Sequence, residues 1–71
     1  MAGREVSFEF TRIGNAVKVT AIDAATLVEV SIQGPAATSE TALRATAIRK
    51  LDYVLARRAR SQRDPLGKDE T

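Results

Sequence analysis

The sequence predicts an α+β fold with two layers, in which a three-stranded antiparallel meander packs against a single C-terminal helix. Apolar and polar residues alternate along three successive segments, which is the period of half-buried strands. A Gly-Asn pair separates the first two segments and suits a tight hairpin turn. A longer segment, residues 39–60, repeats its apolar residues at the period of an α-helix.

The first two strands form a hairpin whose apolar side chains share one face. A two-residue loop at Gly14-Asn15 pairs Phe10 with Val19 and Phe8 with Ala21. A shift of one residue would turn all of these side chains to solvent, so the pattern favours this register. The inward residues of the hairpin are Val6, Phe8, Phe10, Val17, Val19 and Ala21.

The third strand is predicted over residues 27–33. Its inward residues are Val28, Val30 and Ile32, and Gly34-Pro35 ends it. The turn before it, at residues 23–26, has either a two-residue or a four-residue loop. Both lengths keep the apolar residues on the same face, so the sequence leaves this turn open.

The helix over residues 39–60 has an amphipathic pattern and suitable ends. Thr38 or Ser39 can cap its first turn with a side-chain oxygen. Glu40 in the first turn and arginines in the last turn both suit the helix dipole. The apolar face that should cover the sheet consists of Leu43, Ala47, Ile48, Leu51, Val54 and Leu55.

The 71-residue length limits the chain to one small domain, which we place at residues 5–60. Residues 1–4 have no pattern and are expected to be frayed. Residues 61–71 are polar, contain a proline and a glycine, and lack periodicity. We therefore expect a disordered polar tail there.

Several kinds of chemistry lack the residues that they need. The chain contains no cysteine and no histidine, and it has no Gly-rich phosphate loop and no serine nucleophile motif. Glu9 and Glu29 share the outer sheet face across Thr20, where they are expected to be ordinary solvated charges. We predict a protein that is not an enzyme and has no cofactor, no metal and no small-molecule substrate.

No apolar run approaches the roughly 20 residues that span a bilayer, and the N-terminus lacks the apolar core of a signal peptide. The sequence therefore predicts a cytoplasmic protein with no membrane partner.

The positive charge is concentrated on the helix. Residues 1–38 sum to −1, residues 39–63 to +5 and residues 64–71 to −2. The candidate nucleic-acid-binding residues are Arg49, Lys50, Tyr53, Arg57, Arg58 and Arg60. Arginines also favour a helix C-terminus and keep a small protein soluble, so the same pattern has an explanation without a ligand.

Protein partners are indicated by two features of the predicted sheet. Its outer face carries three apolar side chains, Ile13, Ile22 and Leu27. Its meander leaves two edge strands open to pairing with another chain. These features favour a homodimer or another protein partner.

Two motifs carry a resemblance to a known family. The hairpin FTRIGNAVKVTAID and the helix AIRKLDYVL, in a match over residues 5–58, resemble a family of short, uncharacterised alphaproteobacterial proteins. This resemblance implies a stand-alone bacterial domain and no assigned activity. In that family the second turn carries a proline and a glycine, where this chain has Ala24 and Leu27.

The β-β-β-α order is also similar to the second part of the double-stranded-RNA-binding domain. That domain grips phosphates with lysines at the start of its last helix. The matching positions here are Ser39, Glu40 and Thr41, so the motif is missing. We therefore predict a non-enzymatic interaction or self-association module, with binding of an RNA or DNA backbone by the helical arginines as the alternative.

Overall fold

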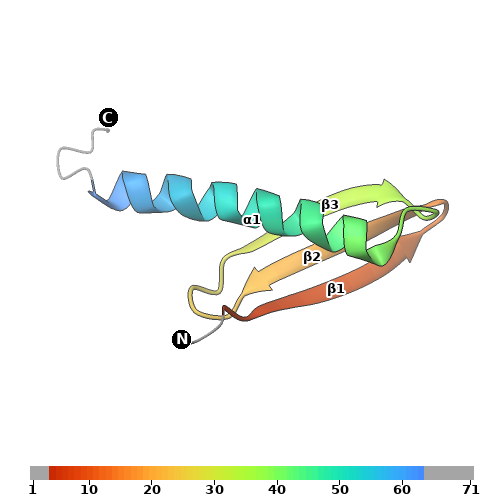
Figure 1. Ribbon diagram of the computed structural model, residues 1–71, viewed down its shortest axis with the longest axis horizontal. Helices are drawn as coiled ribbons and strands as arrows, with labels where there is room; N and C mark the ends of the chain where they lie inside the picture. The colour runs from red at the N-terminus through yellow and green to blue at the C-terminus, as the bar shows by residue number, and fades with distance from the viewer. Residues whose placement is uncertain (1–3, 64–71) are drawn as a thin grey trace.

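The computed structural model describes residues 4–63 and has the predicted α+β architecture. Strands β1 (Val6–Ile13), β2 (Ala16–Asp23) and β3 (Glu29–Pro35) precede a single helix, α1 (Glu40–Arg63). The strands form one antiparallel sheet in the order β1-β2-β3. The helix lies across one face of this sheet, so the molecule has two layers (Figure 1).

The first hairpin has the predicted register. Phe10 pairs with Val19 and Phe8 with Ala21, and Ile13 and Ala16 flank the two-residue loop. Gly14 has a φ of 60°, a left-handed conformation that glycine adopts without steric cost. The Gly-Asn pair therefore sets the loop length, and the loop length sets the register.

The second turn has a four-residue loop and differs from the predicted start of β3. Asp23 N donates to Val28 O at 2.9 Å, which leaves residues 24–27 in the loop. Leu27, predicted as the first residue of the strand, instead has a φ of 63° and belongs to the turn. Beyond Val28 the regular strand starts at Glu29.

At its other end β3 continues through Gly34 and Pro35, two residues beyond the predicted end. Gly34 pairs with Val17, and Pro35 pairs with Ala16. The ladder continues because β2 still offers partners there. Pro35 lies on an edge strand, where a missing N–H group removes no ladder hydrogen bond.

Ser39 is the residue that caps α1. Its Oγ accepts a hydrogen bond from Ala42 N at 3.2 Å, and its carbonyl oxygen accepts from Leu43 N at 3.1 Å. The helix continues to Arg63, so residues 61–63 are helical and do not belong to the predicted tail. A physical reason is that residues 61–63 come before Pro65 and the residue next to it, where the backbone restrictions of proline act most directly. The rest of the predicted tail, residues 64–71, lies outside the described residues.

The core is the predicted one. Among the described residues the buried hydrophobic side chains are Val19, Ala21, Val30, Leu43, Ala47 and Leu51. Partly buried side chains packed against them are Val6, Phe8, Phe10, Val17, Val28, Ile32, Val54 and Leu55. Ile48, also predicted on the apolar face, is half-buried.

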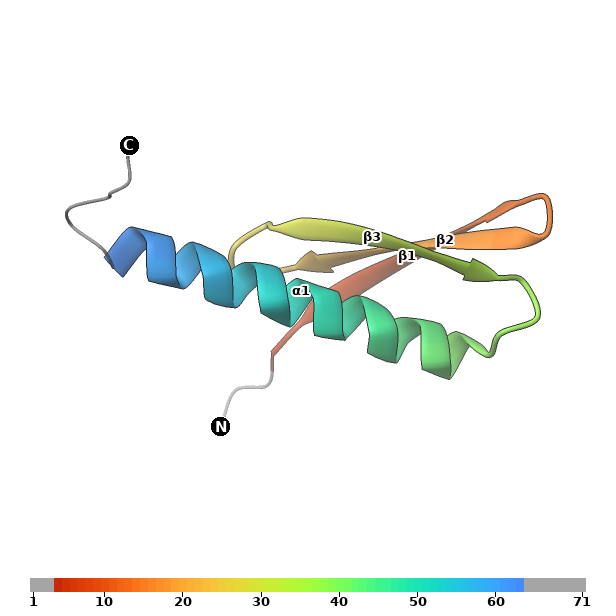
Figure 2. The same cartoon turned by 90° about the horizontal axis from the view of Figure 1, so that it is seen from above.

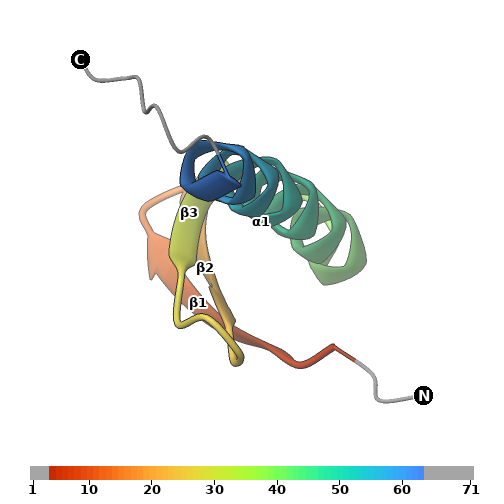
Figure 3. The ribbon, with the colours of Figure 1, turned by 90° about the vertical axis from the view of Figure 1, so that its left-hand side faces the viewer.

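The helix does not cover the three strands equally. It packs mainly on β2 and β3, and the end-on view shows it on the β3 side of the sheet (Figure 3). A Cβ atom at Gly34 would lie 2.7 Å from Leu43 Cδ2, so the glycine allows α1 to approach β3 closely. The C-terminal turns of α1 extend past the end of the sheet (Figure 2).

Candidate functional site

Asp23 joins three parts of the fold. Its carboxylate accepts hydrogen bonds from Thr26 N at 3.0 Å and Thr26 Oγ1 at 2.8 Å, which fix the β2–β3 turn. Arg4 Nε donates to Asp23 Oδ1 at 3.3 Å, and Arg4 Nη1 donates to Asp52 on the helix. Residues 1–4 were predicted to be frayed, but two carboxylates hold Arg4 in place. Residues 1–3 lie outside the described residues.

The Asp23 carboxylate is buried, with 6% of its side chain exposed. The Thr26 hydroxyl lowers the pKa of this carboxyl most, burial opposes that shift, and the Thr26 amide and Arg4 lower the pKa further. The group is paired within the fold and serves the turn. Its contacts indicate a structural role.

The hydrogen bonds next to the second turn show which residues of each edge strand face outwards. Ala24 N donates to Glu5 O at 3.0 Å, so the odd-numbered residues of β1 bond to β2. The even-numbered residues then direct their backbone groups to the free edge: Val6, Phe8, Phe10 and Arg12. In β3, by the same alternation from the Asp23–Val28 bond, the outward residues are Glu29, Ser31 and Gln33.

The two free edges differ in protection. On β3, Lys50 Nζ donates to Ser31 O at 2.8 Å, and Pro35 offers no N–H group to another strand. On β1, no hydrogen bond from another part of residues 4–63 reaches the outward backbone groups. The β1 edge is therefore the one open to pairing.

The apolar row beside the open edge is also incompletely covered. Phe8 and Phe10 are half-buried, and their ring centroids lie 6.5 Å apart. The Arg44 guanidinium lies over both rings, at 5.7 Å and 5.6 Å from the centroids. Sequence reasoning missed Arg44, although its position within the apolar arc of the helix was a signal that it faces the sheet.

The three predicted interface residues do not form one patch. Ile13 is 53% exposed at the end of β1, and Leu27 is 75% exposed in the β2–β3 turn. These positions lie at opposite ends of the sheet, because the eight residues of β2 separate the two turns. Ile22 is half-buried on β2.

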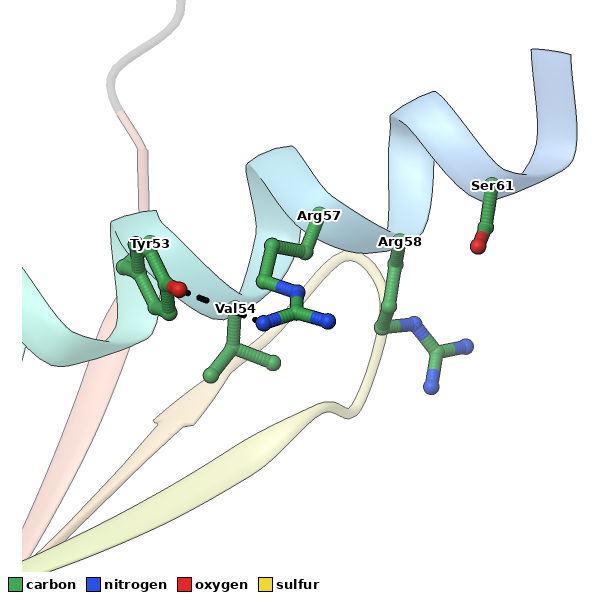
Figure 4. A pocket seen from close by; sticks show the side chains of 5 residues that line it. All are labelled: Tyr53, Val54, Arg57, Arg58 and Ser61. Atoms are coloured by element: carbon green, nitrogen blue, oxygen red, sulfur yellow. Dashed lines mark hydrogen bonds between the residues drawn. The ribbon is translucent and has the colours of Figure 1, made fainter. Parts of the chain in front are cut away.

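The predicted nucleic-acid-binding residues are divided over the surface of α1. Tyr53, Arg57 and Arg58 line one open hollow of about 450 Å³, together with Val54 and Ser61 (Figure 4). Lys50 is held at the β3 edge. By helical period, Arg49 and Arg60 lie on the face away from the sheet. Val54 and Ser61 were not predicted as site residues, and their helical spacing from Arg57 and Arg58 was the available signal.

Other kinds of site are not represented in the described part of the chain. Residues 4–63 contain no cluster of three or more acidic side chains that could hold a metal ion. Within the same residues no helix is long and apolar enough to cross a bilayer.

The sequence matches a protein-family model over residues 3–58, which include the whole sheet and most of α1. The model describes a domain of unknown function, DUF6898. The chain belongs to this family. Membership in a family of unknown function is what the hairpin and helix motifs predicted. No curated protein matches the chain, and no solved structure matches it.

Proposed function

We propose that this DUF6898 domain is a non-enzymatic self-association module, and that two copies pair through their β1 strands. The observation that carries the proposal is the contrast between the two sheet edges. Lys50 and Pro35 protect the β3 edge, whereas the β1 edge presents outward backbone groups beside the half-exposed Phe8 and Phe10. An exposed edge strand is a template for pairing with another chain.

The side chains of β1 favour an antiparallel pairing about a two-fold axis at Phe10. This register places Phe10 opposite Phe10 of the second copy and Phe8 opposite Arg12 of the second copy. It also places Glu9 opposite a threonine. A register centred on Glu9 would set two carboxylates directly opposite each other, which is destabilising. The pairing continues the sheet to six strands and places the two apolar rows side by side.

Arg12→Pro tests the pairing without removing a core side chain. Arg12 is exposed and its N–H group points to the free edge, so proline removes a donor that only a second copy would use. Proline is tolerated on edge strands, and the residue before it must be extended, as Thr11 already is. We expect the wild-type protein to sediment as a dimer at micromolar concentrations and Arg12→Pro to sediment as a monomer.

Arg12→Ala is the matched control. It removes the same side chain, including the 2.8 Å hydrogen bond from Arg12 Nε to Gly14 O, but keeps the backbone N–H group. We expect this variant to remain dimeric, and circular dichroism should show that both variants fold. A monomeric wild-type protein would contradict self-association. A dimeric Arg12→Pro variant would exclude the β1 edge as its route.

A further inference from the structure

The hollow on the C-terminal half of α1 collects hydrogen-bond donors around a small apolar floor. Its lining residues are Tyr53, Val54, Arg57, Arg58 and Ser61. Tyr53, Arg57 and Ser61 come from successive turns, and the two arginine side chains extend to the same side as Val54 (Figure 4). The hollow begins where Val54 still packs against the core, and the C-terminal turns of α1 then extend past the end of the sheet (Figure 1).

Contacts within the hollow hold one of its guanidinium groups in place. Arg57 lies over the Tyr53 ring at 5.7 Å, and its Nη1 donates to the Tyr53 hydroxyl at 3.2 Å. Because the phenol oxygen accepts this bond, its own proton remains available to another acceptor. The other polar lining groups, the Arg58 guanidinium and the Ser61 hydroxyl, can donate as well.

Among residues 4–63 no carboxylate lines the hollow, and the nearest acidic residue of the helix is already paired. Asp52 accepts from Arg4, while residues 53–63 contain four arginines and no acidic residue. The negative end of the helix dipole, equivalent to about half a charge, opposes an anion here. Two guanidinium charges outweigh it, and the hollow begins more than two turns before Arg63.

We propose that this hollow binds the phosphate groups of a single-stranded nucleic-acid backbone. A phosphate oxygen accepts from several donors at once, which is what two guanidinium groups and two hydroxyl groups offer. Lys50 lies seven residues before Arg57, two turns earlier along the same side of the helix, and continues the positive track. A membrane surface fits less well, because residues 56–63 contain no large apolar side chain to enter a bilayer.

The test compares two double variants with the same net charge. Arg57→Gln/Arg58→Gln removes the two arginine charges that line the hollow, and Arg49→Gln/Arg60→Gln removes two arginine charges that do not line it, from the helix face away from the sheet. Binding of a fluorescein-labelled uridine oligonucleotide is measured by anisotropy over a range of salt concentrations. The logarithm of the binding constant falls linearly with the logarithm of the salt concentration, and each phosphate contact to a single strand contributes about 0.7 to the size of this salt slope. Loss of two contacts therefore weakens binding about 25-fold at about 0.1 M salt.

We expect this loss for the hollow variant, with a salt slope reduced by about 1.4, and a change of less than about threefold for Arg49→Gln/Arg60→Gln. Equal losses of oligonucleotide affinity in the two variants would show that the positive charge of the helix attracts the oligonucleotide without a specific site, and would overturn the proposal. Absence of binding by the wild-type protein would also overturn it. Co-sedimentation of the protein with phosphatidylserine vesicles is measured in parallel. If the protein binds the vesicles and does not bind the oligonucleotide, the nucleic-acid proposal is overturned in favour of a membrane surface.

Discussion

Two residues at the β2–β3 turn, Asp23 and Leu27, have opposite effects on the stability of this small sheet. Asp23 accepts two hydrogen bonds from Thr26 and one from Arg4, which in turn reaches Asp52 on the helix. Leu27, four residues later, holds a φ of 63° while 75% of it is exposed to solvent. One residue therefore stabilises the turn through its partners, and the other has a backbone conformation that a β-carbon disfavours.

Leu27→Gly should stabilise the domain. A left-handed conformation costs a non-glycine residue about 1–2 kcal/mol, and glycine costs about 0.5–1 kcal/mol in additional chain entropy. Little packing is lost at so exposed a position, so we expect the free energy of unfolding to rise by up to about 1 kcal/mol. Urea unfolding measures it. Ala25→Gly, in the same loop without a positive φ, should lower stability instead, and a gain there would contradict this explanation.

Asp23 should make stability depend on acid pH. Its pKa is lower in the folded protein than in the unfolded chain, so its contribution is complete above the ordinary value of about 3.9. That contribution decreases as the pH falls below this value, because protonation then favours the unfolded chain. Asp23→Asn should lower the thermal midpoint at neutral pH and differ less from the wild-type protein at about pH 3.

The control for this experiment is Glu29→Gln, because Glu29 is an exposed carboxylate and makes no salt bridge within residues 4–63. Its midpoint should stay close to that of the wild-type protein at both pH values. A difference between Asp23→Asn and the wild-type protein that is the same at neutral and acid pH would show that packing, and not charge, decides the effect.

At the scale of elements, the connection between β3 and α1 decides which strands are covered. Ala36 N donates to Asn15 O at 2.8 Å and Thr38 N donates to Pro35 O at 2.9 Å, so residues 36–39 turn tightly. The helix consequently begins beside the end of β3, where Gly34 leaves room for Leu43. A helix anchored there lies on β2 and β3 and leaves the inward row of β1 half-covered.

Gly34→Val should therefore disturb the contact between the helix and the sheet. Its β-carbon would lie 2.7 Å from Leu43 Cδ2, and Leu43 is itself buried and cannot move freely. Overpacking of this kind costs about 1–3 kcal/mol in the free energy of unfolding, measured by urea titration. Gln33→Val, the exposed neighbour, should change stability by less than about 0.5 kcal/mol. Similar values for the two variants would show that the helix tolerates the added volume.

At the scale of the whole molecule, the helix is displaced toward β3 and is longer than the three-stranded sheet that it covers. The sideways displacement leaves Phe8 and Phe10 partly exposed next to an unprotected strand edge. The extra length carries the C-terminal turns past the sheet, with the hollow beside Arg57 and Arg58. The two proposed binding surfaces thus arise from the position and the length of the same helix, but they lie on different elements and can be tested separately.

Much of the fold could be predicted because local signals agreed with one another. The alternation in β1 and β2, the Gly14 turn and the apolar face of α1 all specify the same two layers. The start of β3 was predicted two residues early, because Leu27 is apolar and its left-handed backbone has no signature in the side chain. The end of α1 was predicted three residues early, because a polar helical turn and a polar tail have the same composition.

The candidate sites could be predicted only in part, because they depend on which distant residues meet. The sequence indicated arginines on the helix, yet it did not separate those that line the hollow from those that do not. It grouped Ile13 with Leu27, which the two turns hold at opposite ends of the sheet. The helical period indicated that Arg44 faces the sheet, but not that it covers two phenylalanine rings.

Local sequence patterns were sufficient to predict the elements, their order, the register of the first hairpin and the residues of the core. These follow from side-chain periods of two and 3.6 and from one glycine turn, all of which are local properties of the chain. Two features follow only from the packing of the helix on the sheet: Lys50 protects one sheet edge while the other stays open, and Arg57 and Arg58 share a hollow. Those features depend on the position of α1 relative to the sheet, which the short connection after Pro35 and the space above Gly34 set together.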